Sequence, residues 1–99
     1  MNPAPFLTVS ATGANIATSA TSANVAIPNT SAGQRPRFVR VHATAAAYVR
    51  MGPSAPTAAA GDMIVDPASP VILNVSGHTH IAALQVAAAG IVNVTPLED

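Results

Sequence analysis

Hydrophobic and polar residues alternate most clearly in the middle of the chain. In residues 37–42 and 48–51, phenylalanine, valine and methionine are interleaved with arginine, histidine and tyrosine. A period of two is typical of a β-strand with one buried and one exposed face. A short alanine and threonine connection, residues 43–47, joins the two segments, so we predict that they pair as a β-hairpin. Its buried face is expected to carry Val39, Val41, Val49 and Met51.

Shorter runs of β-branched residues lie on either side of this centre and are separated by 9 prolines and 6 glycines. Further strands are predicted at residues 6–10, 15–20, 23–27, 62–65, 71–75, 80–86 and 91–95. We expect turns at 76–77 and 87–90, and an end to the last strand before Pro96. The alanines at 82–83 and 87–89 favour helix by propensity alone, but Gly77 and Gly90 bracket segments of strand length. About eight short strands without a helix predict an all-β fold, a single compact antiparallel β-sandwich of jelly-roll-like form.

A chain of 99 residues has the length of one domain. We divide it into an N-terminal arm or first strand (residues 1–12) and a β-sandwich domain (residues 13–99). Phe6 and Leu7 follow two prolines in the N-terminal segment. That segment either forms the first strand of its own sandwich or adds as an edge strand to a neighbouring subunit, where backbone hydrogen bonds would hold it.

Charge is scarce in this sequence. Charged residues make up 8% of the chain, against about 25% in an average soluble domain, and the net charge is zero. Hydrophobic residues make up 49%, and 22 of them are alanine. Because low net charge favours association, we expect other protein subunits to cover much of the surface. The alternative is a monomer coated with threonine, serine and alanine.

Several classes of function are disfavoured by composition. The chain has no cysteine, so it has neither a disulfide nor a thiolate metal site. Four arginines are balanced by four acidic residues, which leaves no basic excess for nucleic acid. The start lacks the basic region of a secretory signal, and the longest apolar stretch, residues 81–92, is too short to span a bilayer. We therefore expect no nucleic-acid or membrane partner and synthesis in the cytoplasm.

No catalytic motif is present. The sequence has no nucleophile elbow and no phosphate-binding loop, and Asp62 and Asp66 are expected at a strand end and a turn rather than as an acid–base pair. We predict that the protein is not an enzyme and binds no cofactor. His78 and His80 would point to the same side of a strand and could chelate an ion together. Metal sites usually need three or four ligands, so we predict a histidine pair without metal.

The basic residues are clustered, since every one of them lies between Arg35 and Arg50. On the predicted hairpin Arg40, His42, Tyr48 and Arg50 have the same parity and would share one face. One hypothesis is that this cationic face binds an acidic patch of another subunit. The alternative is that Asp62, Asp66 or water neutralises it within the same chain.

Four segments carry a resemblance to a known family. They are RFVRV at 37–41, AYVRMG at 47–52, HIAAL at 80–84 and GIVNVTP at 90–96. In this order they resemble small β-sandwich virion proteins of tailed bacteriophages, of the capsid decoration (cement) or head-fibre type, over residues 36–95. Two features depart from the family pattern. The loop of the predicted central hairpin lacks the usual Asn or Gly, and the chain ends in Pro-Leu-Glu-Asp at residues 96–99, where the family commonly has a glycine. These departures leave the subfamily open.

The resemblance implies a structural virion protein, specifically a capsid decoration protein that binds the outer capsid lattice and stabilises it by bridging subunits. The alternative is a tail, head-fibre or baseplate component; a carbohydrate-binding module, the remaining class, usually displays more aromatic residues than this chain has. The implied partners are the major capsid protein or other virion proteins. A homo-oligomer is expected, with a trimer suggested by lattice symmetry alone, located in the virion after synthesis in the host cytoplasm. The protein-interface candidates are Phe6, Leu7, Arg37, Arg40, His42, Tyr48 and Arg50.

Overall fold

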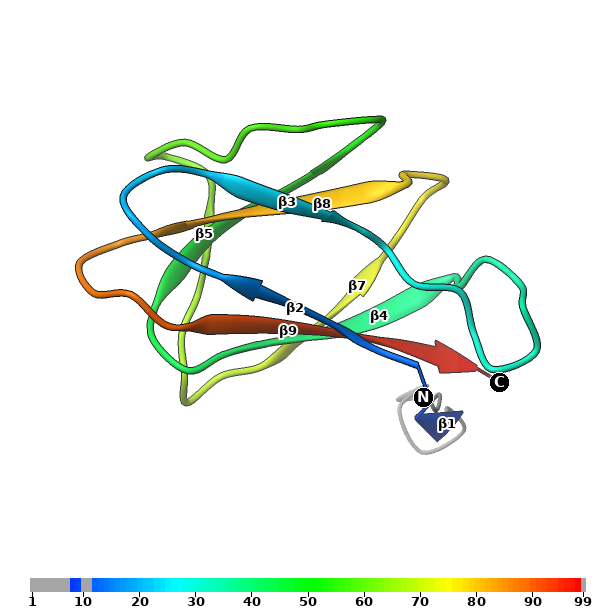
Figure 1. The fold of residues 1–99 in the computed structure, drawn as a ribbon. Coiled ribbons are helices and arrows are strands. Elements are labelled where there is room, and N and C mark those ends of the chain that lie inside the picture. The colour runs from blue at the N-terminus through cyan, green and yellow to red at the C-terminus, as the bar shows by residue number, and fades with distance from the viewer. Residues whose placement is uncertain (1–7, 10–11, 99) are drawn as a thin grey trace.

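The protein is a stack of two β-sheets (Figure 1). The computed structural model describes residues 8–9 and 12–98, and all the regular elements of this part are strands. They are β1 (Thr8–Val9), β2 (Ala14–Ala17), β3 (Ala23–Ala26), β4 (Phe38–Ala43), β5 (Ala47–Gly52), β6 (Met63–Val65), β7 (Val71–Asn74), β8 (His80–Gln85) and β9 (Ile91–Glu98).

The strands pair in a nested order. Sheet A has the order β2-β9-β4-β7, with β1 beside the far end of β9, and sheet B has the order β3-β8-β5-β6. Every pair is antiparallel, and β2 pairs with β9, β3 with β8, β4 with β7 and β5 with β6. A ribbon folded over in this way is a jelly roll. The predicted all-β sandwich is confirmed.

The core lies between the inner faces of the two sheets. Alternate residues of each strand point inward, as the period of two requires. On sheet A the fully buried side chains include Val39, Val41 and Ala43 of β4, with Val92 and Val94 of β9 opposite them in the register. Sheet B contributes Ala47, Val49, Val65, Ile81 and Ala83. The predicted burial of Val39, Val41 and Val49 is confirmed, and Met51 is half-buried against this core.

The predicted hairpin of the central strands is wrong. β4 lies in sheet A and β5 in sheet B, so residues 44–46 cross from one sheet to the other. Both edges of β4 are already paired, with β9 and β7. Crossing over also places Val41 and Val49 on inner faces that pack against each other, which removes more apolar surface from water than a flat hairpin would. The β8–β9 connection also crosses between the sheets, because β8 lies in sheet B and β9 in sheet A.

The last strand extends farther than predicted. β9 continues through Pro96 to Glu98 instead of ending before the proline. On one side of β9, residues 91–94 pair with β2 and residues 97–98 with β1. Pro96 lies between the part of β9 that pairs with β2 and the part that pairs with β1. Neither of these pairings needs a hydrogen bond from the N–H that proline lacks, so a proline is tolerated at this position. On the other side Pro96 is fully buried opposite Val39.

The N-terminal segment is described only in part. Thr8 and Val9 pair through the backbone with Glu98 and Leu97 of the same chain, as expected for a first strand. Phe6 and Leu7, the proposed interface residues of this segment, lie outside the described residues.

The long β5–β6 connection covers part of the outer face of sheet B (Figure 1). Ala58 is buried, and its N–H donates to Ser22 Oγ at 2.8 Å. The connection ends at Asp62, whose Oδ1 accepts a hydrogen bond from Arg50 Nη2 at 2.7 Å and whose Oδ2 accepts one from the Ala59 N–H at 2.8 Å. The Arg50 hydrogen bond, with the Ala59 N–H second, holds the pKa of Asp62 below its usual value.

We predict that Asp62→Asn lowers the free energy of unfolding at pH 7 and that the difference from the wild type shrinks in acid. The pKa of Asp62 is lower in the folded than in the unfolded chain. Its contribution is therefore complete above the unfolded value, about 3.9, and is lost as the pH falls through the lower folded value. Denaturant unfolding of both proteins between pH 7 and pH 2 measures this. The free energy of unfolding of Arg50→Gln should approach that of the wild type in acid in the same way. A difference from the wild type that is as large at pH 2 as at pH 7 would contradict the stabilising role of the Arg50–Asp62 pair.

Candidate interaction surface

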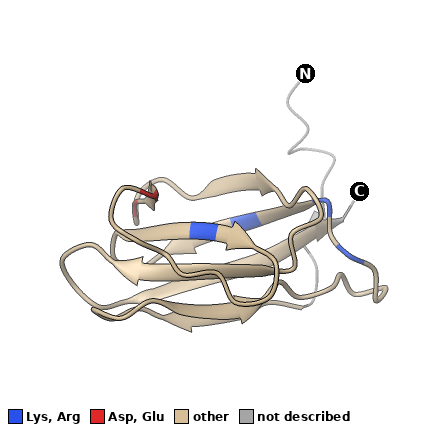
Figure 2. Ribbon diagram, turned by 90° about the horizontal axis from the view of Figure 1, so that it is seen from above, with Lys and Arg blue, Asp and Glu red and all other residues tan. Residues whose placement is uncertain are grey.

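The few charged side chains are spread over separate parts of the sandwich (Figure 2). Arg40 and His42 lie on the outer face of sheet A, whereas Tyr48 and Arg50 lie on the outer face of sheet B. The predicted single cationic face of these four residues is therefore wrong. They do have the same parity, but parity fixes only that each points outward, and the two strands belong to opposite sheets.

Each of these residues has its own surroundings. Arg50 is neutralised within the chain by Asp62, which is the alternative that the sequence left open. His42 Nε2 lies 3.1 Å from the Pro67 carbonyl oxygen, and this contact links the β6–β7 connection to β4. Arg40 is exposed on β4 between Thr95 and Ile72.

The remaining two candidates are also apart. Tyr48 is half-buried between Ile64 and Leu84 on sheet B. Arg37 is exposed just before β4, with its guanidinium carbon 5.7 Å from the centre of the Phe38 ring. The five candidates in the described part of the chain thus do not form one surface, and the role of all seven as interface residues stays a prediction.

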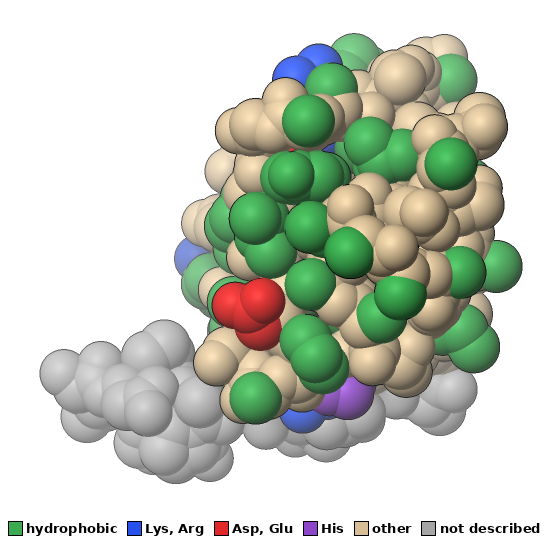
Figure 3. Space-filling view, turned by 90° about the vertical axis from the view of Figure 1, so that its left-hand side faces the viewer, with side chains coloured by type: hydrophobic (Ala, Val, Ile, Leu, Met, Phe, Trp, Pro, Cys, Tyr) green, Lys and Arg blue, Asp and Glu red, His purple; other side chains and the backbone are tan. Residues whose placement is uncertain are grey.

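A different surface is formed where four connections meet at one end of the sandwich, shown in Figure 3. We call it the loop end: residues 18–22, 44–46, 66–70 and 86–90. Asp66 is the only charged residue in these connections. Their exposed residues include Ala20, Pro67, Ala68, Pro70, Val86, Ala87, Ala88 and Ala89. The exposed Ile64 and Ile91 are close to them in sequence. Ser19, Thr21, Thr44 and Ser69 are exposed there as well. The loop end is therefore mainly apolar, built of small side chains and nearly free of charge.

Two threonines hold the loop end together. Thr18 donates its N–H to the Gly90 carbonyl at 2.9 Å, and its Oγ1 accepts the Gly90 N–H at 2.8 Å. Thr44 makes the same exchange with Ile91, at 2.9 and 2.8 Å. Thr18 is buried despite its hydroxyl, and its partners satisfy that group.

Backbone bonds continue the same pattern. The Gln85 N–H donates to the Ser19 carbonyl at 3.1 Å, and the Val86 N–H to the Ala46 carbonyl at 3.2 Å. Three connections from different parts of the chain are thus fixed to one another. These three connections form a preformed surface rather than a set of independent loops, and the fourth, residues 66–70, is linked to β4 by the His42 contact.

Sequence reasoning identified residues 87–90 as a turn but missed the surface. Turns usually use glycine, asparagine, aspartate or serine, because these residues adopt tight conformations easily. Apart from Thr44 and Gly90, the connections at 44–46 and 86–90 consist of alanine and valine. Apolar residues at positions that do not need them are the signal that could have indicated a contact surface.

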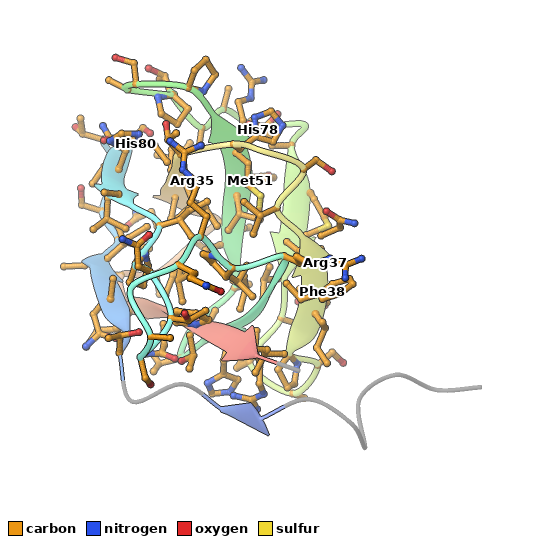
Figure 4. All side chains as sticks on the ribbon, turned by 90° about the vertical axis from the view of Figure 1, so that its right-hand side faces the viewer. Arg35, Arg37, Phe38, Met51, His78 and His80 are labelled. Carbon is orange, nitrogen blue, oxygen red and sulfur yellow. The ribbon has the colours of Figure 1, made fainter. Side chains whose placement is uncertain are left out.

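The opposite end of the sandwich carries an open pocket of about 500 Å³, and several of its lining residues are labelled in Figure 4. Arg35 and Arg37 line it from the β3–β4 connection, and His78 and His80 from the segment before and at the start of β8. Thr79 Oγ1 lies 2.8 Å from His80 Nδ1. No group of three or more His, Cys, Asp or Glu side chains in the described part of the chain could hold a metal ion.

Residues 8–9 and 12–98 contain no helix of the length and apolarity needed to cross a membrane.

We predict that Gly90→Ala destabilises the protein. A Cβ at Gly90 would lie 2.7 Å from Thr44 Oγ1, 2.9 Å from Ala45 Cβ and 3.0 Å from Ala45 N. Forcing atoms into such a packed site typically costs about 1–3 kcal/mol. Gly13→Ala is the control, since its nearest contact would be an ordinary 3.6 Å. Urea denaturation of both variants measures the effect, and equal stability of Gly90→Ala and Gly13→Ala would show that the loop end is not fixed as described.

Comparison of the chain with protein-family models, with curated proteins and with solved structures found no match.

Proposed function

We propose that this chain is a structural protein of a bacteriophage particle, a capsid decoration protein that seats its loop end on the outer capsid lattice and bridges neighbouring subunits. The observation that carries the proposal is the loop end itself, a preformed apolar surface on which Asp66 is the only charged residue of the four connections. A protein that acts alone in water leaves such a surface exposed and gains nothing from it. A protein covered by neighbours gains stability, because contact removes this apolar surface from water.

Covering the loop end would be favourable for three physical reasons. Each square ångström of apolar surface removed from water contributes about 25 cal/mol. Alanine side chains lose no rotamer entropy on burial. The hydrogen bonds of Thr18 and Thr44 already fix the connections, so little ordering remains to oppose binding. Stabilisation of a shell would then come from many copies acting together.

The resemblance to phage virion proteins supports the assignment to a particle. Its four segments, RFVRV, AYVRMG, HIAAL and GIVNVTP, fall on β4, β5, β8 and β9. These are the inner strands of the two sheets. The resemblance therefore concerns the core pattern of the sandwich. Jelly rolls occur in viral capsid proteins and also in lectins, so the fold alone does not decide between them.

A carbohydrate-binding role is less well supported. Sugar-binding sites of this kind usually display aromatic platforms. The aromatic residues within the described ranges are Phe38 and Tyr48, which lie on the outer faces of different sheets.

The partner we propose is the major capsid protein, and the location is the virion. The chain would act there as a homo-oligomer, a trimer if it follows the local threefold axes.

The proposed position on the capsid is tested by stoichiometry in purified particles. Quantitative mass spectrometry should find the chain in a fixed ratio to the major capsid protein. A copy number far below that ratio would favour the alternative, a tail, head-fibre or baseplate component. Absence from purified particles would contradict both.

The loop end is tested by placing a charge on it. Ala88→Glu should weaken binding to shells that lack the protein by about tenfold or more, because a carboxylate would be buried without a partner. Ala32→Glu is the matched control, since Ala32 is an exposed alanine in the β3–β4 connection. Co-sedimentation of each variant with shells measures binding. Equal retention of the two variants would contradict docking through the loop end.

A further inference from the structure

The pocket at the end of the sandwich opposite the loop end has the size of a ligand site. Its volume is about 500 Å³, within the range of roughly 300–1,000 Å³ that small-molecule pockets occupy. Its walls are the β3–β4 connection, the end of β7 and the turn that leads into β8. In Figure 4 the Arg35 side chain lies between His78 and His80.

The walls of this pocket are preformed. Ser76 and Gly77 have φ angles of 53° and 78°, and the His78 N–H donates to the Val75 carbonyl at 3.0 Å. Residues 75–78 therefore form a type I′ turn. Asn74 Oδ1 accepts the Ser76 N–H at 2.8 Å and so fixes the start of the turn.

Two further bonds join the walls to each other. The Val75 N–H donates to the Arg37 carbonyl at 2.9 Å, and the Ile27 N–H to the Thr79 carbonyl at 2.8 Å. Pro36, between the two arginines, is buried and anchors the β3–β4 connection. The backbone positions of Arg35 and His78 are therefore set by the fold.

The pocket is cationic. Its lining includes two arginines and two histidines, and no acidic residue of the described part of the chain lines it. Of the two acidic residues whose side chains are described, Asp62 is bound to Arg50 on sheet B, and Asp66 lies at the loop end. The planar guanidinium group binds carboxylates through two parallel hydrogen bonds, and histidine adds further N–H donors. A carboxylate is the group that this set of side chains fits.

An apolar slot continues from the pocket. It has a volume of about 330 Å³ and shares Asn74, Ser76 and His78 with the pocket. Its apolar lining comes from Val49, Met51, Met63 and Leu73 of β5, β6 and β7. Arg50 also lines it, with its guanidinium group paired to Asp62. Met51 and Leu73 are only half-buried and Met63 is 44% exposed, so apolar surface remains available there. A ligand that spans both spaces would carry a carboxylate next to an apolar side chain.

We propose that the pocket and the slot together bind an acidic peptide segment of a partner protein, in which a Glu or Asp carboxylate meets Arg35, His78 and His80 while a neighbouring leucine-like side chain enters the slot. This site is at the other end of the sandwich from the loop end and does not depend on the proposed function. Its test uses the isolated full-length chain and no particle, so one proposal can fail while the other stands.

The probe is the capped peptide acetyl-Leu-Glu-Leu-amide, titrated into the isotopically labelled protein and followed by NMR. We expect saturable shifts of the signals of Arg35, residues 76–80 and the methyl groups of Met51 and Met63, with a dissociation constant of roughly 0.1–1 mM. The Glu-to-Gln analogue should bind about tenfold more weakly or worse, since it loses the charge-assisted hydrogen bonds. Acetyl-Ser-Glu-Ser-amide should also bind more weakly, because it leaves the slot empty.

Arg35→Gln is expected to weaken binding of the glutamate peptide about tenfold. Arg40→Gln is the matched control, because Arg40 is an exposed arginine on the outer face of sheet A and its loss removes the same charge outside the pocket. The NMR spectra of both variants without peptide report whether they are folded.

Four results would overturn the proposal. The first is equal binding of the glutamate and glutamine peptides, and the second is equal weakening by Arg35→Gln and Arg40→Gln. The third is binding of inorganic phosphate as tight as that of the peptide, which would identify a site for free anions. Absence of saturable shifts at residues 76–80 would overturn it equally.

Discussion

The packing of two valine- and alanine-rich inner faces against each other is the interaction on which the rest of this structure depends. Val39, Val41, Val92 and Val94 on sheet A face a layer that includes Val49, Val65 and Ile81 on sheet B. The side chains are small, so the core is thin and each strand must keep its register for its apolar side to stay inside. The nested pairing follows from this constraint, because a single ribbon folded over itself buries one whole face at once.

The positions and parity of the strands could be predicted because alternation is a local property of the sequence. Pairing could not, since the alternation in residues 37–42 and 48–51 specifies which side is buried and not which sheet a strand joins. The predicted hairpin failed for this reason. The extension of β9 through Pro96 depends on where β2 gives way to β1, which is also a property of the fold. The cationic pocket was missed because Arg35 lies more than forty positions before His78 along the chain, and only backbone bonds such as Val75 to Arg37 bring the two regions together.

The two ends of the sandwich have different chemistry. The loop end is apolar, nearly uncharged and held by Thr18 and Thr44. The opposite end is cationic, with a pocket that opens into an apolar slot. A protein that bridges subunits needs two contact surfaces, and a rigid sandwich between them keeps their separation fixed. Apolar burial at one end is not weakened by charge screening, whereas carboxylate binding at the other weakens as salt screens the charges. The two contacts would therefore respond differently to solution conditions.

If the loop end is a docking surface, neighbouring proteins cover it in the assembled particle. A three-dimensional image reconstruction of that particle, at a resolution that traces the chain, would show what contacts it. We expect the jelly roll on the outside of the shell, with residues 44–46 and 86–90 buried against capsid protein. A reconstruction in which the sandwich is attached by another surface, with these connections facing solvent, would contradict it.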